Sequence, residues 1–287
     1  MDKQDQASNH LFGLGIAGNS AGHLQQTGES NAFAKLDDPN KPQALFPFYV
    51  PHAQQDYLAL MPYSADQLQL PKDPQAKVQM EPELALKCHL SYNALGQLIN
   101  LQPIAMTLIN DATHRNAQVT KLAQKKNWGS ASKGLANQEI KITDFTEAAQ
   151  LERFRLCGFH QHNGQWHLCG EDVAVTEYSY FYQQLQQWII TQIQQQQAQA
   201  LFHNIQYLLL EAGCPETILV AIGATRYSAY GEQHQLVSGD QTAIVLYDNN
   251  VFDINQIGSL LAQEKAPASL CNDNIMVLQQ QVINALD

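Results

Sequence analysis

Hydrophobic and polar positions alternate along much of the chain, and this pattern predicts a fold rich in strands. The segment PELALKCHLSYN alternates as a strand does, and GQLINLQPIAMTLIND supplies two further apolar runs that end in a polar cluster. Closer to the C-terminus, ETILVAIGATRYSAYGEQHQLVSGDQTAIVLYD predicts two apolar strands around a turn-rich loop. Proline and aromatic residues between positions 44 and 74 predict short strands and turns.

One turn and one long helix complete this pattern. Asn163-Gly164 separates two alternating segments, and this dipeptide favours a two-residue hairpin turn because both positions accept a positive φ. Residues 177–212 predict a helix that ends at Gly213, with apolar residues at helical spacing: Leu185, Trp188, Ile189 and Ile193. The glutamines of this helix, including Gln194 to Gln197, are interpreted as a solvated face.

The chain is expected to form one structural unit in three parts. Residues 1–9 predict a disordered tail, residues 10–75 an N-terminal or lid segment packed on the core, and residues 76–287 the core itself. Together these elements indicate a β-rich chain of the α/β (α+β) class.

The composition limits where in the cell the protein is expected and which partners it is expected to bind. Of the 287 residues 45% are hydrophobic, yet no apolar run approaches the roughly 20 residues of a membrane helix, so no membrane association is expected. The polar start MDKQDQASNH and five cysteines without a CxxC pair favour the cytoplasm and reduced thiols. A formal charge of −11 argues against nucleic acid, because only the run from Lys121 to Lys126 is basic.

Acidic residues in two separate segments are the candidate functional residues. Glu81 and Glu83 are two residues apart on a predicted strand, so both carboxylates point to the same face. An exposed strand face would explain them, but the apolar surroundings in MEPELALK favour burial, and a cation would then relieve their repulsion. Asp111 follows an apolar strand as a third carboxylate. Hard oxygen ligands favour Mg²⁺ or Mn²⁺.

These segments, taken in order, resemble the fumarylacetoacetate hydrolase superfamily. That family carries an ExE on a strand, then ND-x-S/T-x-R, then a lysine after a tryptophan, and this chain has EPE, NDATHR and WGSASKGL. The resemblance implies that Glu81, Glu83 and Asp111 are metal ligands. It also implies that Arg115 lies behind the metal or on the substrate, and that Lys133 meets a substrate oxygen.

Flanking segments extend the resemblance over residues 12 to 247. GNSAGHLQQTGE resembles the segment with the family's catalytic His-x-x-Glu: His23 matches the histidine, Gln26 stands at the glutamate position, and Glu29 is the nearest acidic substitute. AIGATRYSA resembles the G-T-P-x-G loop, which implies that Gly223 and Thr225 lie near the substrate carboxylate. The implied fold is a mixed β-roll or sandwich with peripheral helices, as in the C-terminal domain of the family, commonly in a homodimer.

Two other patterns offer different chemistry. GLGIAG places Gly13, Gly15 and Gly18 in the dinucleotide-binding pattern, followed by Asp37 and Asp38 at the spacing of a ribose-binding acid. The β-rich remainder does not repeat βαβ units, so we interpret these glycines as turn and helix-entry residues.

The predicted hairpin suggests a zinc site. Pairing across its turn sets His160 opposite His167, with His162 and Cys169 on the same face, although a solvated polar face explains the pattern equally well.

The favoured function is a Mg²⁺- or Mn²⁺-dependent enzyme that acts on a small 2-oxo or 1,3-dicarbonyl carboxylic acid. Either C–C hydrolysis, as in an acylpyruvase, or decarboxylation creates an enolate that a cation stabilises. In this hypothesis Lys133 adds positive charge, His23 activates water or moves a proton, and Thr225 orients the carboxylate. The alternative is a non-catalytic metal- or metabolite-binding protein on the same scaffold.

Overall fold

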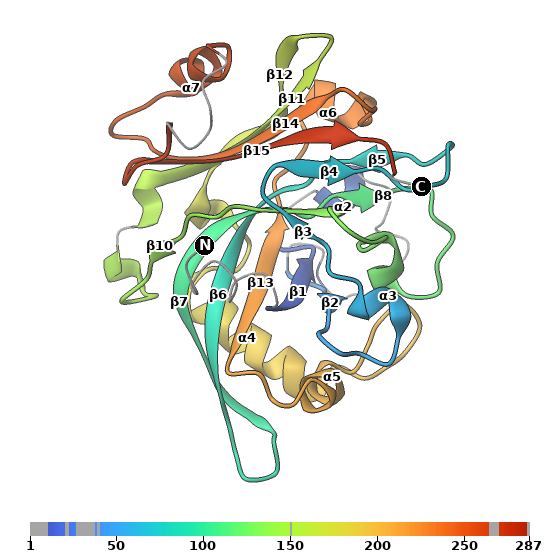
Figure 1. Ribbon diagram of the computed structural model, residues 1–287. Helices are drawn as coiled ribbons and strands as arrows, with labels where there is room; N and C mark the ends of the chain where they lie inside the picture. Colours follow the sequence, from blue (N-terminus) through green and yellow to red (C-terminus); the bar gives the residue numbers. More distant parts are fainter. Residues whose placement is uncertain are drawn as a thin grey trace, which may run out of the picture.

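The structure, a computed structural model, describes residues 11–20, 23–26, 38, 41–149, 151–263 and 270–285. The predicted tail 1–9 and Glu29 lie outside the described residues. Figure 1 shows two main layers of strands with short helices around them. This is the β-rich α/β architecture that the sequence predicts.

The larger sheet has eight strands and is strongly curled (Figure 1). Its order is β2-β1-β13-β6-β7-β9-β3, with β10 paired to β7. Its members are β1 (Phe12–Ala17), β2 (Ala44–Tyr49), β3 (Tyr63–Ser64), β6 (Pro82–Tyr92), β7 (Leu98–Asn110), β9 (Lys133–Leu135), β10 (Ile140–Lys141) and β13 (Thr217–Ala224). The two apolar runs after residue 96 thus form the single long strand β7.

The second sheet has five strands in the order β12-β11-β14-β15-β4. It consists of β4 (Gln67–Gln69), β11 (Phe154–His162), β12 (Gln165–Ala174), β14 (Gln241–Asp248) and β15 (Ile275–Ile283). A small third sheet pairs β5 (Val78–Gln79) with β8 (Thr113–His114). Strands from residues 10–75 take part in both main sheets, β1 inside the larger sheet and β4 at an edge of the smaller one. The division into lid and core stays a prediction.

Helices cover the edges of the sheets. They are α2 (His23–Gln26), α3 (Asp56–Ala59), α4 (Tyr182–Gln195), α5 (Ile205–Glu211), α6 (Ala229–Gln233) and α7 (Ile254–Leu261), with 3₁₀ turns at Leu122–Lys125, Glu147–Ala149, Leu151–Arg153 and Val175–Glu177. In Figure 1, α4 and α5 lie in the lower half of the molecule, α4 against β7 of the larger sheet, and α7 lies beside the smaller sheet. None of the helices in the described ranges has the length and apolar character that crossing a bilayer requires.

The helix predicted for residues 177–212 is two helices, and tertiary contacts explain the break. The side chain of Gln196 binds both backbone groups of Leu45, accepting from its N–H (2.9 Å) and donating to its carbonyl (2.8 Å). Asn204 then caps α5 by accepting from the Tyr207 N–H (2.9 Å). Gln194 likewise donates to the Leu98 carbonyl (2.8 Å), so these glutamines are not simply a solvated face. Gly213 does end the helical region, with a φ of 79°.

A continuous apolar core fills the space between the layers. Alternate residues of β6, such as Leu84 and Leu86, point into it and are fully buried. Leu185, Ile189 and Ile193 of α4 bury the predicted apolar stripe in the same core. The carboxylates described below therefore lie at the end of strands whose position is fixed by this packing.

The predicted hairpin turn is confirmed. β11 and β12 pair with His162 opposite Gln165, and Asn163 and Gly164 have φ values of 51° and 79°. Both positive values match the turn that Asn-Gly favours.

The first two glycines of GLGIAG lie inside β1 rather than in a turn, so their interpretation as turn and helix-entry residues is wrong. A Cβ on Gly13 would lie 2.2 Å from the Phe48 ring, and one on Gly15 would lie 2.2 Å from the Phe46 ring. These glycines let two aromatic rings pack directly on the strand backbone. Gly18, with a φ of 81°, does lie in the turn after β1. A dinucleotide loop is not formed.

We predict that Gly13→Ala destabilises the protein by about 1–3 kcal/mol, because the added methyl group forces the Phe48 ring out of its place. The matched control is Gly258→Ala in α7, where the nearest atom lies 3.9 Å from the new Cβ and where alanine is favoured by up to about 1 kcal/mol. Denaturant unfolding measures both. Equal stability of the two variants would contradict the packing role of Gly13.

A second prediction concerns acid stability. Burial, with a smaller effect of Lys121, lowers the pKa of His203 from 6.5 to about 4. The unfolded chain therefore takes up this proton first as the pH falls, and stability is lost between pH 6.5 and 4. In this window the parent protein should lose on the order of 1–3 kcal/mol of its free energy of unfolding, and His203→Asn should not show this loss. The melting temperature against pH measures both. His89→Asn, at an exposed position of β6, should leave the acid slope unchanged.

Candidate functional site

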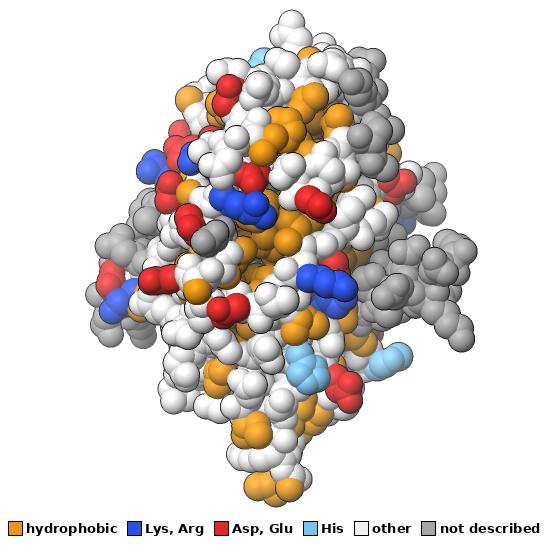
Figure 2. Space-filling view, turned by 90° about the vertical axis from the view of Figure 1, so that its left-hand side faces the viewer, with side chains coloured by type: hydrophobic (Ala, Val, Ile, Leu, Met, Phe, Trp, Pro, Cys, Tyr) orange, Lys and Arg blue, Asp and Glu red, His pale blue; other side chains and the backbone are white. Residues whose placement is uncertain are grey.

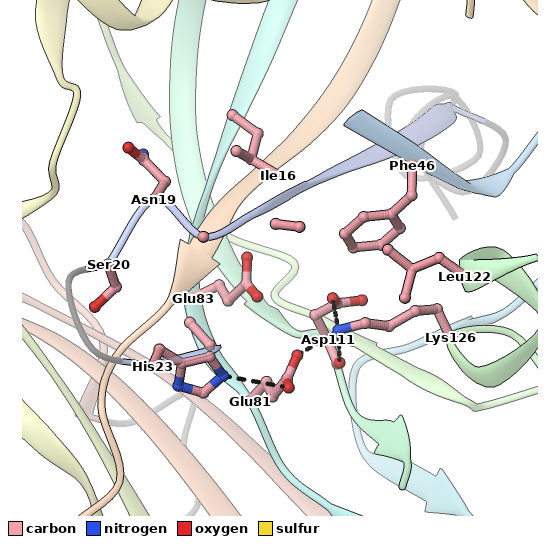
Figure 3. A pocket seen from close by; sticks show the side chains of 13 residues that line it. Ile16, Asn19, Ser20, His23, Phe46, Glu81, Glu83, Asp111, Leu122 and Lys126 are labelled. Atoms are coloured by element: carbon pink, nitrogen blue, oxygen red, sulfur yellow. Dashed lines mark hydrogen bonds and ion pairs between the residues drawn. The ribbon is translucent and has the colours of Figure 1, made fainter. Parts of the chain in front are cut away.

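Three carboxylates meet where β6 begins and β7 ends. Antiparallel pairing sets Pro82 opposite Asn110, so the residues on either side of this pair are neighbours. The Asp111 N–H donates to the Glu81 carbonyl (3.0 Å). Glu81, Glu83 and Asp111 are all buried, and each offers an oxygen within 4.8 Å of the others (Figure 3).

Asn110, the residue before Asp111, fixes the approach of the two strands. Its side-chain carbonyl accepts from the Glu81 N–H (3.0 Å), and its amide donates to Gln280 of β15 (3.0 Å). One asparagine therefore connects the carboxylates to both main sheets.

Lys126 is the functional residue that sequence reasoning missed. Its Nζ lies between two of the acids, donating to Glu81 Oε2 and to Asp111 Oδ2, the latter at 2.5 Å (Figure 3). The sequence showed only a basic run at this place. Leu122, Ala123 and Lys126 are all buried, and their spacing along a helical turn is the signal that could have separated Lys126 from the half-buried Lys121 and Lys125.

Glu81 has two further partners. Arg115 Nη2 lies 2.5 Å from Glu81 Oε1, and His23 Nε2 lies 3.5 Å from the same oxygen. Burial alone would raise the pKa of Glu81, but Lys126 and Arg115 outweigh it and hold that pKa well below its usual range. Glu81 is therefore ionised in the folded protein.

Glu83 differs from Glu81 in its surroundings. It accepts a hydrogen bond from the Gly223 N–H (2.8 Å), and no ion pair of Glu83 is found in the described part of the chain. Burial and the neighbouring charge of Asp111 raise its pKa well above its usual range. Gly223 thus contacts an acid of the cluster, and its φ of 121° suits glycine.

Lys133 lies behind Asp111 rather than in the cavity. Its side chain is fully buried, with Nζ 2.9 Å from Asp111 Oδ1 and 2.7 Å from the Ala112 carbonyl. Burial lowers the pKa of Lys133 to about 8. Lys133 is not among the residues that line the cavity, and its contact with a substrate oxygen stays a prediction. Arg115 likewise binds Glu81, Gln79 (2.9 Å) and Tyr227 (2.8 Å).

A small cavity of about 20 Å³, open to solvent, lies beside the cluster. Its lining combines the three carboxylates with His23 and Lys126 and the turn after β1, including Asn19 and Ser20. The Nδ1 atom of His23 is buried and has no hydrogen-bond partner among the described residues. The cavity is therefore lined by acids, a cation and an imidazole whose Nδ1 has no partner in the described part of the chain.

Thr225 belongs to a neighbouring hollow, which shares Ser20 with this cavity. Its hydroxyl is buried without a partner among the described residues, and Arg226 lines the same hollow with Glu171 and Glu177. Over the described ranges we find no ion pair for Arg226. The loop thus presents a hydroxyl and a guanidinium for which the described residues offer no hydrogen-bond or ion-pair partner.

Gln26 does not face the carboxylates. Its side-chain amide forms two hydrogen bonds with the backbone of Tyr227, accepting from the N–H (2.9 Å) and donating to the carbonyl (3.1 Å). It also donates to Glu232 (2.8 Å). Here the residue at the family's glutamate position holds the loop after β13.

The hairpin histidines form a second group with a different partner from the one expected. His160 and His162 both contact the carboxylate of Asp240, at 2.7 Å and 2.8 Å, and these residues offer atoms within 4.8 Å of one another. His167 instead stacks on Tyr230 (4.3 Å between ring centroids), and burial raises the pKa of Cys169 to about 12, which disfavours a thiolate ligand. The expected His₃Cys set is therefore not brought together.

Several solved structures share this architecture. The chain superposes on Cg1458 with an inhibitor (TM-score 0.53, 16% identity, 96% of this chain and 78% of that chain) and on a yeast fumarylacetoacetate hydrolase family protein, ynq8 (0.52, 16%, 98% and 96%). A third is 2-keto-3-deoxy-D-arabinonate dehydratase complexed with magnesium and 2,5-dioxopentanoate (0.51, 13%, 97% and 75%). The resemblance to the fumarylacetoacetate hydrolase superfamily is confirmed for the fold.

By sequence, the chain belongs to the family of unknown function DUF5718, which it matches over residues 29–282. No curated protein matches the sequence.

Gln26→Glu, which introduces the glutamate of the family pattern, is predicted to destabilise the protein by about 1–3 kcal/mol. The carboxylate loses the donor to the Tyr227 carbonyl and lies against Glu232. Adding Glu232→Gln should restore part of the loss, whereas Glu232→Gln alone should be close to neutral. Thermal and denaturant unfolding measure the stability of each variant. A Gln26→Glu variant as stable as the parent would show that the hydrogen bonds of Gln26 with Tyr227 contribute nothing to stability.

Proposed function

We propose that the cavity binds a small 2-oxo or 1,3-dicarbonyl carboxylic acid and stabilises an enolate formed by C–C hydrolysis or decarboxylation. The observation that carries the proposal is the convergence of the carboxylate cluster, a lysine ammonium and an imidazole on one small cavity. Solved structures of the same fold bear the names of a dehydratase of a keto acid and of 5-carboxymethyl-2-hydroxymuconate delta-isomerase from Mycobacterium smegmatis (TM-score 0.52, 13% identity, 97% of this chain and 81% of that chain). A homodimer in the cytoplasm stays a prediction.

His23 is the proposed proton carrier. Glu81 is ionised and can only accept, so in the neutral form of His23 the Nε2 hydrogen faces Glu81 and Nδ1 is an acceptor. An imidazole in this tautomer can take a proton from water or from a substrate hydroxyl at Nδ1. The tilted contact of His23 with Tyr227 (5.3 Å between centroids) helps to fix the ring.

An anionic substrate needs positively charged or polar contacts for its oxo group and for its carboxylate. Lys126 is the cation that lines the cavity, and it is the proposed contact for an oxo or enolate oxygen. Thr225 and Arg226 are the proposed contacts for the carboxylate, because their polar groups have no partner within the described residues.

Whether a divalent metal fits here depends on space as well as on donors. Glu81, Glu83 and Asp111 are the oxygen ligands that Mg²⁺ or Mn²⁺ prefers, and such an ion would polarise a substrate oxo group when bound. Lys126, however, already uses Glu81 Oε2 and Asp111 Oδ2. The donors fit a metal, but the site does not fit one while the ammonium stays there, so we assign no step to a metal.

A second candidate function is binding without catalysis. It is favoured by Gln26, which cannot act as a base and whose amide is engaged by Tyr227 and Glu232. Such a protein would bind the acid without converting it.

A panel of acylpyruvates and oxaloacetate tests the proposed function. We expect turnover of at least one acid by the parent protein, and a fall in kcat of about 100-fold or more in Asp111→Asn and in His23→Asn. Asp273→Asn, at an exposed position outside the cavity, is the matched control and should keep the parent rate.

The remaining outcomes separate the two functions. Calorimetric binding of an acid without turnover would support the non-catalytic protein. Turnover that is unchanged in Asp111→Asn would place the reaction elsewhere and would overturn the proposal.

A further inference from the structure

We propose that the ammonium of Lys126 is the resident cation of the carboxylate cluster and takes the place that a divalent metal would occupy. The inference deepens the proposed function by naming the cation, and it rests on that proposal only for what the cation does to a substrate. The evidence comes from contacts, from charge balance and from the way the lysine is held.

Two carboxylates hold the ammonium. Lys126 Nζ donates to Glu81 Oε2 and to Asp111 Oδ2 (2.5 Å), and it lies farther from the Asp111 carbonyl (3.4 Å), the contact that a substrate oxygen would replace. The side chains of this group are nearly or fully buried, with 6% exposure for Lys126 and 0% for Asp111. A divalent ion between the acids would need the same two carboxylate oxygens.

Charge balance is already met without a metal. Three cations contact a cluster of at most three negative charges, Lys126 and Arg115 at Glu81 and Lys133 at Asp111, so the positive charge already equals or exceeds the negative charge. A divalent ion added to this set would leave an excess of positive charge in a buried place, where unpaired charge is strongly unfavourable. Its binding therefore requires Lys126 to leave.

The backbone around Lys126 opposes that departure. The Lys126 N–H donates to the Ala123 carbonyl (3.0 Å), and the next residue, Asn127, is buried and donates to the carbonyls of Phe48 and Leu60, both at 2.8 Å. Trp128 Nε1 donates to the Gln69 carbonyl (2.8 Å). The Lys126 ammonium also lies over the Phe46 ring, 5.1 Å from its centroid. The lysine thus extends from an anchored segment into the cluster.

Manganese binding tests the inference directly. We expect the parent protein, freed of metal by chelator and dialysis, to bind Mn²⁺ only at millimolar concentrations in calorimetry and electron paramagnetic resonance. In Lys126→Met, the uncompensated carboxylates should bind Mn²⁺ at least about tenfold more tightly, and Mn²⁺ should raise the melting temperature of this variant more than that of the parent. Lys125→Met, which removes a neighbouring lysine from the same turn, should behave as the parent.

Micromolar Mn²⁺ binding by the parent protein would overturn the inference, as would an affinity that Lys126→Met leaves unchanged or lowers. If Lys126→Met does not fold without Mn²⁺ but folds with it, the inference is supported; if it folds under neither condition, the affinity of the parent protein decides.

The proposed function is tested separately, by turnover with and without metal. Turnover by the metal-free parent supports both proposals, whereas turnover that disappears on chelation and returns with Mn²⁺ keeps the function and rejects Lys126 as the cation. Weak Mn²⁺ binding without any turnover keeps Lys126 and rejects the function.

Discussion

The burial of three neighbouring carboxylates is the constraint on which the site depends. Like charges that are removed from water repel one another strongly, so such a group persists only with cations inside hydrogen-bond distance. Lys126 and Arg115 keep Glu81 ionised, while Glu83, for which the described residues provide no ion pair, has its pKa raised by burial and by the neighbouring Asp111. The cluster therefore contains one carboxyl group with a lowered pKa, Glu81, and one with a raised pKa, Glu83. Because both are buried, the difference in pKa follows from their partners.

The frame around the cluster explains why its geometry is held. Asn110 connects the strand ends to the second sheet through Gln280, and the loop after β13 is clamped by Gln26. On the face shown in Figure 2, acidic and basic side chains are scattered among hydrophobic and uncharged groups, and the basic groups form no continuous patch. The charged groups that contact one another most closely, around Glu81 and Asp111, are instead buried.

Sequence reasoning succeeded where a local pattern has one structural meaning. Asn163-Gly164 defined its turn, the alternation in PELALKCHLSYN defined β6, and the order of EPE and NDATHR led to the fold. It failed where long-range contacts decide. Nothing near Gln196 in the sequence reveals that it binds the backbone of Leu45, and nothing near Gly13 reveals the Phe48 ring. Lys126 was missed for the same reason, because a lysine in a basic run is normally solvated and only the fold brings it to two acids.

The central claim is that a lysine ammonium occupies the carboxylate cluster as its cation. A crystal structure of the protein soaked with Mn²⁺ and oxalate, with anomalous data collected at the manganese edge, tests it most directly. We predict electron density for the Lys126 side chain between Glu81 and Asp111, oxalate beside His23, and no anomalous peak within the cluster. A manganese peak coordinated by Glu81, Glu83 and Asp111, with Lys126 displaced, would contradict the claim.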